Sequence, residues 1–335
     1  MKHRCTAVPE RKAFVLCAMF AFLAIAAGAG AEPAAENTRK PLAGGAVNSA
    51  SATLIVATTL ETKIRLTDTL TIPVLRGSGA LAKDNNLKLK AFAEASPVSA
   101  NAGAEAVLTP IAFLQIFAGG TIGTGWNIPI ADGLRTNEPE LDAEGNRTGG
   151  ATLEDRSFGG IVWSAKAGGT FQFDLGAVVP GDWSHAVFQT THSVQYRAFT
   201  GAQAGESWLY EADDGENRNG WNYYGSAFLG YRPPPRSVPL LEMFGVLAEN
   251  DAYLYGTSGG DEWGDEMGRI KFGPVLAIRA NDRFVVSVLA QWRTLRNYTE
   301  ETQDFAFYQD RILDSENPSR IEFYRAAVNA VWKLK

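Results

Sequence analysis

The chain has few histidines that could act as the general base of nucleophilic catalysis. It holds three histidines, His3, His185 and His192, and His192 stands directly before a potential nucleophile, Ser193. Such a pair works only when the hydroxyl and the imidazole can share a hydrogen bond. Neighbouring residues of a strand point to opposite faces, so His192 and Ser193 cannot pair directly. The sequence therefore predicts no catalytic residue and no enzyme.

Acidic residues gather between the regular segments, where their oxygen atoms could bind a divalent cation. They are dense in 126–157 and recur around Asp213 and Asp265. The run from Asp142 to Asn146 lacks the glycine and the closing glutamate at the spacing of a calcium-binding loop. We therefore expect solvated acidic loops, no metal site and no cofactor.

Composition excludes further classes of function. The net charge of −6 argues against a nucleic-acid partner. Cys5 and Cys17 both lie in a segment that predicts an export signal over 1–31, with a basic start, an apolar alanine-rich run and a small-residue end. The chain after this signal peptide has no cysteine for disulfides or thiolate metal sites. Residues 32–51 are expected to form a flexible lead-in.

The remaining segments must position any functional side chain, and 159–177 shows how. One parity of this segment runs from Ile161 through Trp163 to Leu175, while the other holds Lys166 and Gln172. An unbroken period of two is typical of a strand with one apolar face. At ~3.3 Å per residue the segment would span roughly 60 Å, far beyond an ordinary strand. Such a strand suits the wall of a membrane barrel.

Similar signals recur along the chain and predict an even number of strands. They cover 53–66, 68–76, 86–96, 99–108, 113–124, 159–177, 185–199, 221–232, 240–255, 269–280, 283–296 and 320–334. Short connections rich in turn formers, such as 180–182 and 281–282, alternate with long ones, such as 125–158 and 200–220. The pattern predicts an all-β, closed antiparallel transmembrane barrel of about twelve strands over 52–335, with exposed and mobile long loops on the outer side.

The signal, the strand parity, the loop asymmetry and the closing strand together resemble bacterial outer-membrane β-barrel proteins. The resemblance implies a place in the bacterial outer membrane, contact with its lipids and assembly by the barrel-insertion machinery. Such barrels usually end in a terminal aromatic residue, which here is displaced inward to Trp332. Outer-membrane phospholipases look like twelve-stranded barrels with a histidine and a serine two residues apart. Here Thr190 and Val194 flank His192 at that spacing, so the serine is missing.

The inward parity of the strands carries many charges, with an excess of cations on the wall that joins the two ends of the chain. We predict that these residues line a channel: Lys63, Arg65, Lys88, Lys90, Glu94, Glu105, Lys166, Asp174, Arg197, Glu249, Asp251, Lys271, Arg279, Arg293 and Arg325. The arrangement resembles general porins, in which cationic and anionic walls face each other across a wet constriction. It predicts passive diffusion of small hydrophilic solutes with a modest anion preference.

Two alternatives stay open on the sequence alone. The charges could pair in a filled lumen, which would make the chain a closed structural barrel or a surface-binding barrel that uses its acidic loops. An outer-membrane lipid-modifying enzyme is the third possibility, and it depends on His192.

Overall fold

The computed structural model describes residues 45–59, 61–203, 205–211, 213, 215–254, 263–265 and 267–334. The predicted signal peptide and most of the predicted lead-in lie outside these residues. Within the described part of the chain, no helix is both long enough and apolar enough to cross a membrane.

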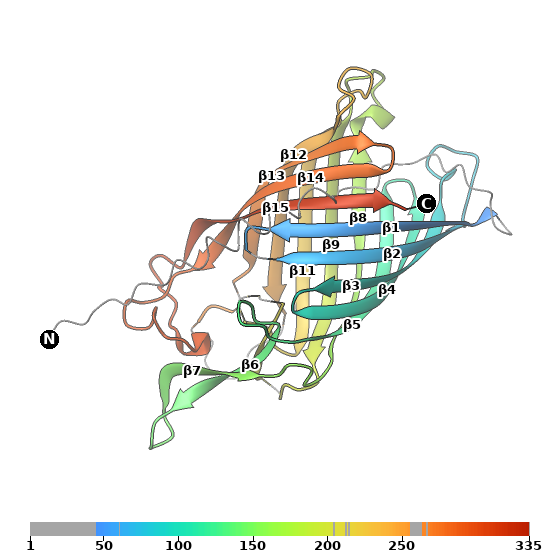
Figure 1. The fold of residues 1–335 in the computed structure, drawn as a ribbon. Coiled ribbons are helices and arrows are strands. Elements are labelled where there is room, and N and C mark those ends of the chain that lie inside the picture. The colour runs from blue at the N-terminus through green and yellow to red at the C-terminus, as the bar shows by residue number, and fades with distance from the viewer. Residues whose placement is uncertain are drawn as a thin grey trace.

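Twelve strands form a closed antiparallel barrel, because β1 pairs with β2 on one side and with β15 on the other (Figure 1). The barrel strands are β1 (Val47–Ala57), β2 (Thr62–Pro73), β3 (Asn86–Ser96), β4 (Ser99–Ile111), β5 (Leu114–Gly125), β8 (Val162–Asp174), β9 (Ala186–Phe199), β11 (Gly220–Tyr231), β12 (Leu241–Tyr253), β13 (Arg269–Asn281), β14 (Phe284–Arg296) and β15 (Ser319–Lys333). The predicted all-β barrel is confirmed.

A second, three-stranded sheet lies outside the barrel wall. It is formed by β6 (Leu134–Leu141), β7 (Arg147–Asp155) and β10 (Ser207–Tyr210), in the order β10-β6-β7. We call this sheet the cap. Figure 1 shows β6 and β7 beyond one end of the barrel. That end, which carries the connections after β1, β3, β5, β9, β12 and β14, is called the loop end, and the opposite end is called the turn end.

The first two strands depart from the sequence prediction. The predicted turn near Thr67 does not exist, because β2 continues through it to Pro73. Ile64, Leu66 and Leu70 keep one parity across Thr67 and Asp68, so the alternation is unbroken. The turn lies at 58–61, which has none of the glycine, proline or asparagine that mark turns. The first strand therefore starts earlier than predicted, inside the expected lead-in.

The long strand predicted at 159–177 is shorter in the structure. β8 has 13 residues and ends at Asp174, where a single 3-10 turn, Leu175–Ala177, begins. The Asp174 carboxylate accepts a hydrogen bond from the Gly176 N–H, 2.9 Å away, and so caps this turn. Alternation of side-chain type alone could not reveal the end of the strand.

The outer face of the barrel is apolar and carries aromatic rings near both ends. Toward the loop end, the Tyr196 ring centroid lies 5.4 Å from those of Trp163 and Trp221. Toward the turn end, Phe171 lies 6.3 Å from Phe188. Large apolar residues of the outer parity are exposed, as for Leu229 at 65%. An apolar belt between two aromatic girdles is the exterior of a transmembrane barrel.

This exterior makes a testable prediction about Ala167, which lies exposed between Ala118 and Val194 of the neighbouring strands. Ala167→Arg should cost roughly 2–4 kcal/mol of unfolding free energy, because it places a charge in the lipid near mid-bilayer. Gln172→Arg, on the inner parity of β8, is the control and should cost much less. Denaturant titration in lipid vesicles measures both, and equal costs would contradict the assigned faces.

Candidate functional site

The predicted channel-lining residues all lie on the inner parity of the barrel strands, opposite the exposed apolar parity. Several of them keep access to solvent inside the barrel. The side chain of Arg65 is 45% exposed and that of Lys166 is 38% exposed. Long cationic side chains pointing into a closed barrel retain such exposure only where the interior leaves room for water.

On one half of the interior, the charges pair along the wall. The Glu94 carboxylate forms an ion pair with Arg65 and lies 3.7 Å from the Lys63 ammonium. Glu105 Oε2 lies 2.8 Å from Lys166 Nζ, and Glu105 Oε1 lies 3.6 Å from Lys90 Nζ. These pairs join neighbouring strands or, for Glu105 and Lys166, two strands with one strand between them. They therefore link strands of the same side of the barrel wall.

The other half of the interior is less cationic than the sequence suggested. Asp251 Oδ2 lies 2.6 Å from Arg269 Nη2, as expected from the parity. Arg293, however, lies 3.2 Å from Glu322, and Arg279 forms an ion pair with Glu242. Neither glutamate was predicted to face inward.

β-bulges explain why Glu242 and Glu322 were not predicted to face inward. The register shifts between Leu241 and Met243 on β12, and again between Gln291 and Trp292 where β14 meets β15. An extra residue at a bulge reverses the side-chain parity beyond it. Glu242 and Glu322 therefore join the interior although simple alternation places them outside.

Lys271 differs from the other interior cations. Its ammonium lies 5.1 Å from the centroid of the Tyr324 ring, and it forms no ion pair with any residue that the structure describes. Glu249, its partner in the β12–β13 register, accepts hydrogen bonds from Tyr224 Oη at 2.6 Å and Gln291 Nε2 at 2.5 Å. Lys271 is thus an interior cation that has no ion pair among the described residues and lies beside Glu249 in the strand register.

The connection between β9 and β11 extends across the loop end of the barrel. We call its described residues from Tyr210 to Asn217, which are 210, 211, 213 and 215–217, the crossing segment. At one side, the Glu211 carboxylate accepts from Lys63 Nζ at 2.7 Å, from Ser99 Oγ at 2.6 Å and from Asn101 Nδ2 at 2.8 Å. These donors lie on β2 and β4.

The crossing segment is bound just as firmly at its other side. Glu216 Oε2 lies 2.9 Å from Arg296 Nη1 and 3.7 Å from Arg269 Nη1, and the Glu216 carbonyl accepts from Tyr253 Oη at 2.5 Å. In the strand order of the closed barrel, β4 and β13 are six places apart, the widest separation that twelve strands allow. Glu211 and Glu216, five positions apart in the sequence, therefore contact strands on opposite sides of the barrel.

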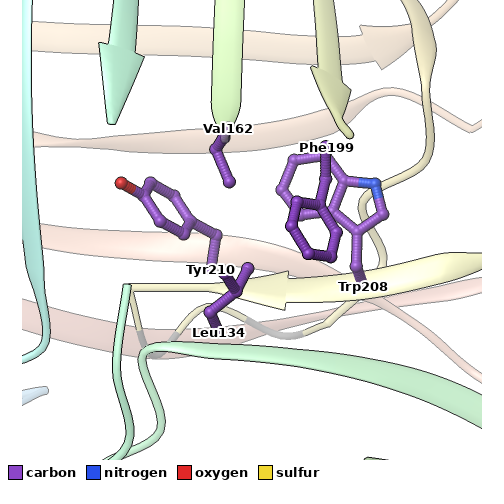
Figure 2. Close-up of a cluster of buried hydrophobic side chains, with 5 residues drawn as sticks. All are labelled: Leu134, Val162, Phe199, Trp208 and Tyr210. Atoms are coloured by element: carbon purple, nitrogen blue, oxygen red, sulfur yellow. The ribbon is translucent and has the colours of Figure 1, made fainter. Parts of the chain in front are cut away.

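The cap holds the crossing segment in place through a small apolar core. Figure 2 shows Val162 and Phe199, at the ends of two wall strands, facing Leu134, Trp208 and Tyr210 of the cap. All five side chains are buried. The loop predicted to be mobile is therefore packed at this point, because its apolar side chains are shielded from water.

Arg197 supports the same arrangement, although it was predicted to line the channel. Its guanidinium lies 5.1 Å from the Trp208 ring centroid and donates to Asn217 Oδ1 at 2.7 Å. Asp174 lies at the turn end, where it contacts His185 Nδ1 at 3.0 Å and Arg232 Nη1 at 3.7 Å. These two residues lie near opposite ends of the barrel.

Glu211 carries the charge that holds the crossing segment. Burial would raise the pKa of this carboxyl, but the Lys63 ammonium and the donors Ser99 and Asn101 outweigh it and lower the pKa. Its contribution to docking is therefore present above the ordinary pKa of a glutamate and is lost as pH falls through the lowered value.

Burial raises the pKa of the neighbouring Asp213 carboxyl. Glu211 also has a left-handed backbone, with φ of 58°, which costs energy for a non-glycine residue.

His192 lies on the lipid-facing side, on the opposite face from Ser193, and contacts Thr190 instead. Thr190 Oγ1 lies 3.0 Å from His192 Nε2, and Tyr223 Oη lies 2.5 Å from His192 Nδ1. The Thr190 hydroxyl donates to the Ser226 carbonyl at 3.0 Å. Its oxygen must then accept from an Nε2–H, so the imidazole is not positioned as a base toward Thr190. This cluster does not support nucleophilic catalysis.

The acidic loops do not assemble a cation site in the part of the chain that the structure describes. No three histidine, cysteine, aspartate or glutamate side chains come together there as metal ligands. Asp142 Oδ1 instead accepts from the backbone N–H groups of Glu144 and Asn146, at 3.0 and 2.7 Å. The carboxylate is thus used to close the β6–β7 turn.

Comparisons with known proteins find only distant structural likenesses. No protein-family model matches the sequence, and no curated protein matches it. Among solved structures, the KdgM porin is 10% identical with a TM-score of 0.35, and the NanC porin is 5% identical with a TM-score of 0.39; each alignment covers 86% of this chain and all of the other. The transport unit of the autotransporter AIDA-I from Escherichia coli is 12% identical, with a TM-score of 0.30, and covers 86% of this chain and 89% of that one. Likenesses this distant carry no functional argument.

Proposed function

We propose that the chain is a bacterial outer-membrane channel for passive diffusion of small hydrophilic solutes, with neither cofactor nor catalysis. The observation that carries the proposal is the partial exposure of inward cations such as Arg65 and Lys166 within a closed barrel. A filled lumen would bury them completely. Their ion pairs run along the wall, so they leave an aqueous path beside them.

A modest anion preference follows from the balance of charges. Most interior cations have a carboxylate partner, which makes the preference small, but the inward parity still holds more cations than carboxylates even with Glu242 and Glu322 included. The acidic loops attract cations at the mouth, but this field extends only about a Debye length, ~8 Å at physiological salt. Charges in the confined interior are screened less by salt, so they determine the ion preference.

Planar-bilayer recording of the refolded protein tests the proposal. Stepwise conductance is expected, and in a salt gradient the reversal potential should lie toward that of the anion, increasingly so as the salt concentration is lowered. A reversal potential on the cation side would remove the anion preference alone. Absence of conductance steps from correctly folded protein would contradict the channel.

A closed barrel with a binding surface is the second candidate. The crossing segment favours it, because Glu211 and Glu216 connect opposite walls at the loop end. In that case the cap would be the surface that contacts a partner, and the wild-type barrel would not conduct.

A further inference from the structure

Part of the barrel interior is apolar, which a channel for purely hydrophilic solutes does not require. Phe228 and Leu247 are register partners on β11 and β12, and Val275 and Leu289 are partners on β13 and β14. All four are on the inner parity and partly exposed. These four residues make up one surface, which ends toward the turn end at the inward polar residues Ser287, Asn329 and Arg279, while Met243, Ala277 and Ala327 are buried. We call this surface the apolar wall.

Glycines shape the apolar wall. Gly230 and Gly245 are register partners beside Phe228, and a Cβ atom at either position would collide with the Phe228 ring. The ring therefore packs over bare backbone, with its edge and outer face left toward the interior. Gly273 is the partner of Leu247 and likewise adds no side chain. The glycines therefore leave the four apolar side chains without neighbouring side chains at these positions.

The other half of the interior, from β2 to β9, is hydrophilic, and it adjoins the apolar wall where Gln189 is the register partner of Phe228. Its inward residues include Gln115, Thr170, Gln172, Gln189, Thr191 and Ser193. Two aromatic rings of this half are covered by cations: the Arg65 guanidinium lies 4.5 Å from the Phe92 centroid, and the Lys166 ammonium lies 5.4 Å from the Phe117 centroid. The barrel interior is thus amphipathic across its width.

Lys271 borders the apolar wall on its loop-end side. It is two residues from Gly273 and four from Val275 on the inner parity of β13. Its ammonium lies over Tyr324 and has no ion pair with the described residues. A cation without an ion pair among the described residues therefore lies near partly exposed apolar side chains.

We propose that the solutes of this channel are amphipathic anions, each with an anionic head that pairs with Lys271 and an apolar body that passes along the apolar wall. This proposal rests on the channel function above. A fully hydrophilic solute gains nothing from Leu247 and Leu289, whereas an apolar body removes their surface from water. An uncharged apolar molecule would lack the contact with Lys271.

Single-channel block by two monovalent sulfonates tests the proposal, using naphthalenesulfonate and hydroxyethanesulfonate. Both keep their charge at any working pH, so neither crosses the lipid as a neutral acid. In the wild-type barrel, the residence time of naphthalenesulfonate should be at least about tenfold longer. Trimethylphenylammonium, an apolar cation, should show no comparable block. Equal residence times for the two anions in a conducting barrel would overturn the proposal and leave the channel function standing.

Variants locate the two contacts. Leu247→Ser with Leu289→Ser should abolish the difference between the two anions, whereas Gln115→Ser with Gln172→Ser, on β5 and β8, should preserve it. Lys271→Gln should shorten the residence of both anions. Unchanged discrimination in the folded leucine variant would refute the role of the apolar wall. If that variant does not fold, the comparison of the three probes in wild-type protein still decides the proposal.

Discussion

Glu211→Gln is expected to raise the time-averaged conductance of the barrel more than any other single change. The substitution keeps the size of the side chain but removes the charge that Lys63, Ser99 and Asn101 bind. Hydrogen bonds to a charged group contribute about 1.5–3 kcal/mol each. A loss of about 2 kcal/mol of docking free energy would raise the undocked fraction of the crossing segment about thirtyfold. Single-channel recording should show longer open intervals.

Glu206→Gln provides a matched control from the same loop. The Glu206 carboxylate accepts from the Gln203 N–H, 2.7 Å away, and so stabilises the loop locally. Its removal should leave conductance unchanged. Lys63→Met should reproduce the effect of Glu211→Gln, and the double variant should add little, because the two residues share one interaction. Identical traces for Glu211→Gln and Glu206→Gln would show that the crossing segment does not limit conduction.

The barrel could be predicted from the sequence because the same alternation of apolar and polar residues recurs in each wall strand. A strand with one face to lipid and one to water must alternate, and the parity of Leu276 and Ile278 against Lys271 and Arg279 shows this directly. The first turn could not be predicted, since Thr58 and Thr59 carry no turn signal. The barrel closes where β1 pairs with β15, and this pairing joins residues that are far apart in the sequence.

The interior was predictable only where the strands are regular. Bulges move Glu242 and Glu322 inside, and no rule of alternation anticipates them. Glu211 and Glu216 come from a loop whose acidic composition indicated only solvation, and their position depends on the apolar core around Trp208. A signal was present in the run Trp208–Leu209–Tyr210, which is too apolar for a solvated loop.

Lys271 and Arg279 share the inward parity of one strand but differ in their ion-pair partners. The sequence predicts two equivalent lining cations on one strand. In the structure, Arg279 pairs with Glu242, whose side chain is 11% exposed, whereas Lys271 has no ion pair among the described residues. Neutralising either residue removes one positive charge from the interior, so both changes should move the reversal potential toward cations.

Stability should separate the two variants. Lys271→Gln leaves no carboxylate without its ion-pair partner, so it should leave the urea midpoint nearly unchanged. Arg279→Gln leaves Glu242 without its partner and should cost roughly 1–3 kcal/mol. Adding Glu242→Gln to Arg279→Gln restores the net charge of the interior, so both the reversal potential and the urea midpoint should return toward wild type. If Lys271→Gln proved as destabilising as Arg279→Gln, Lys271 would belong to a filled interior, and the closed barrel would become the better description.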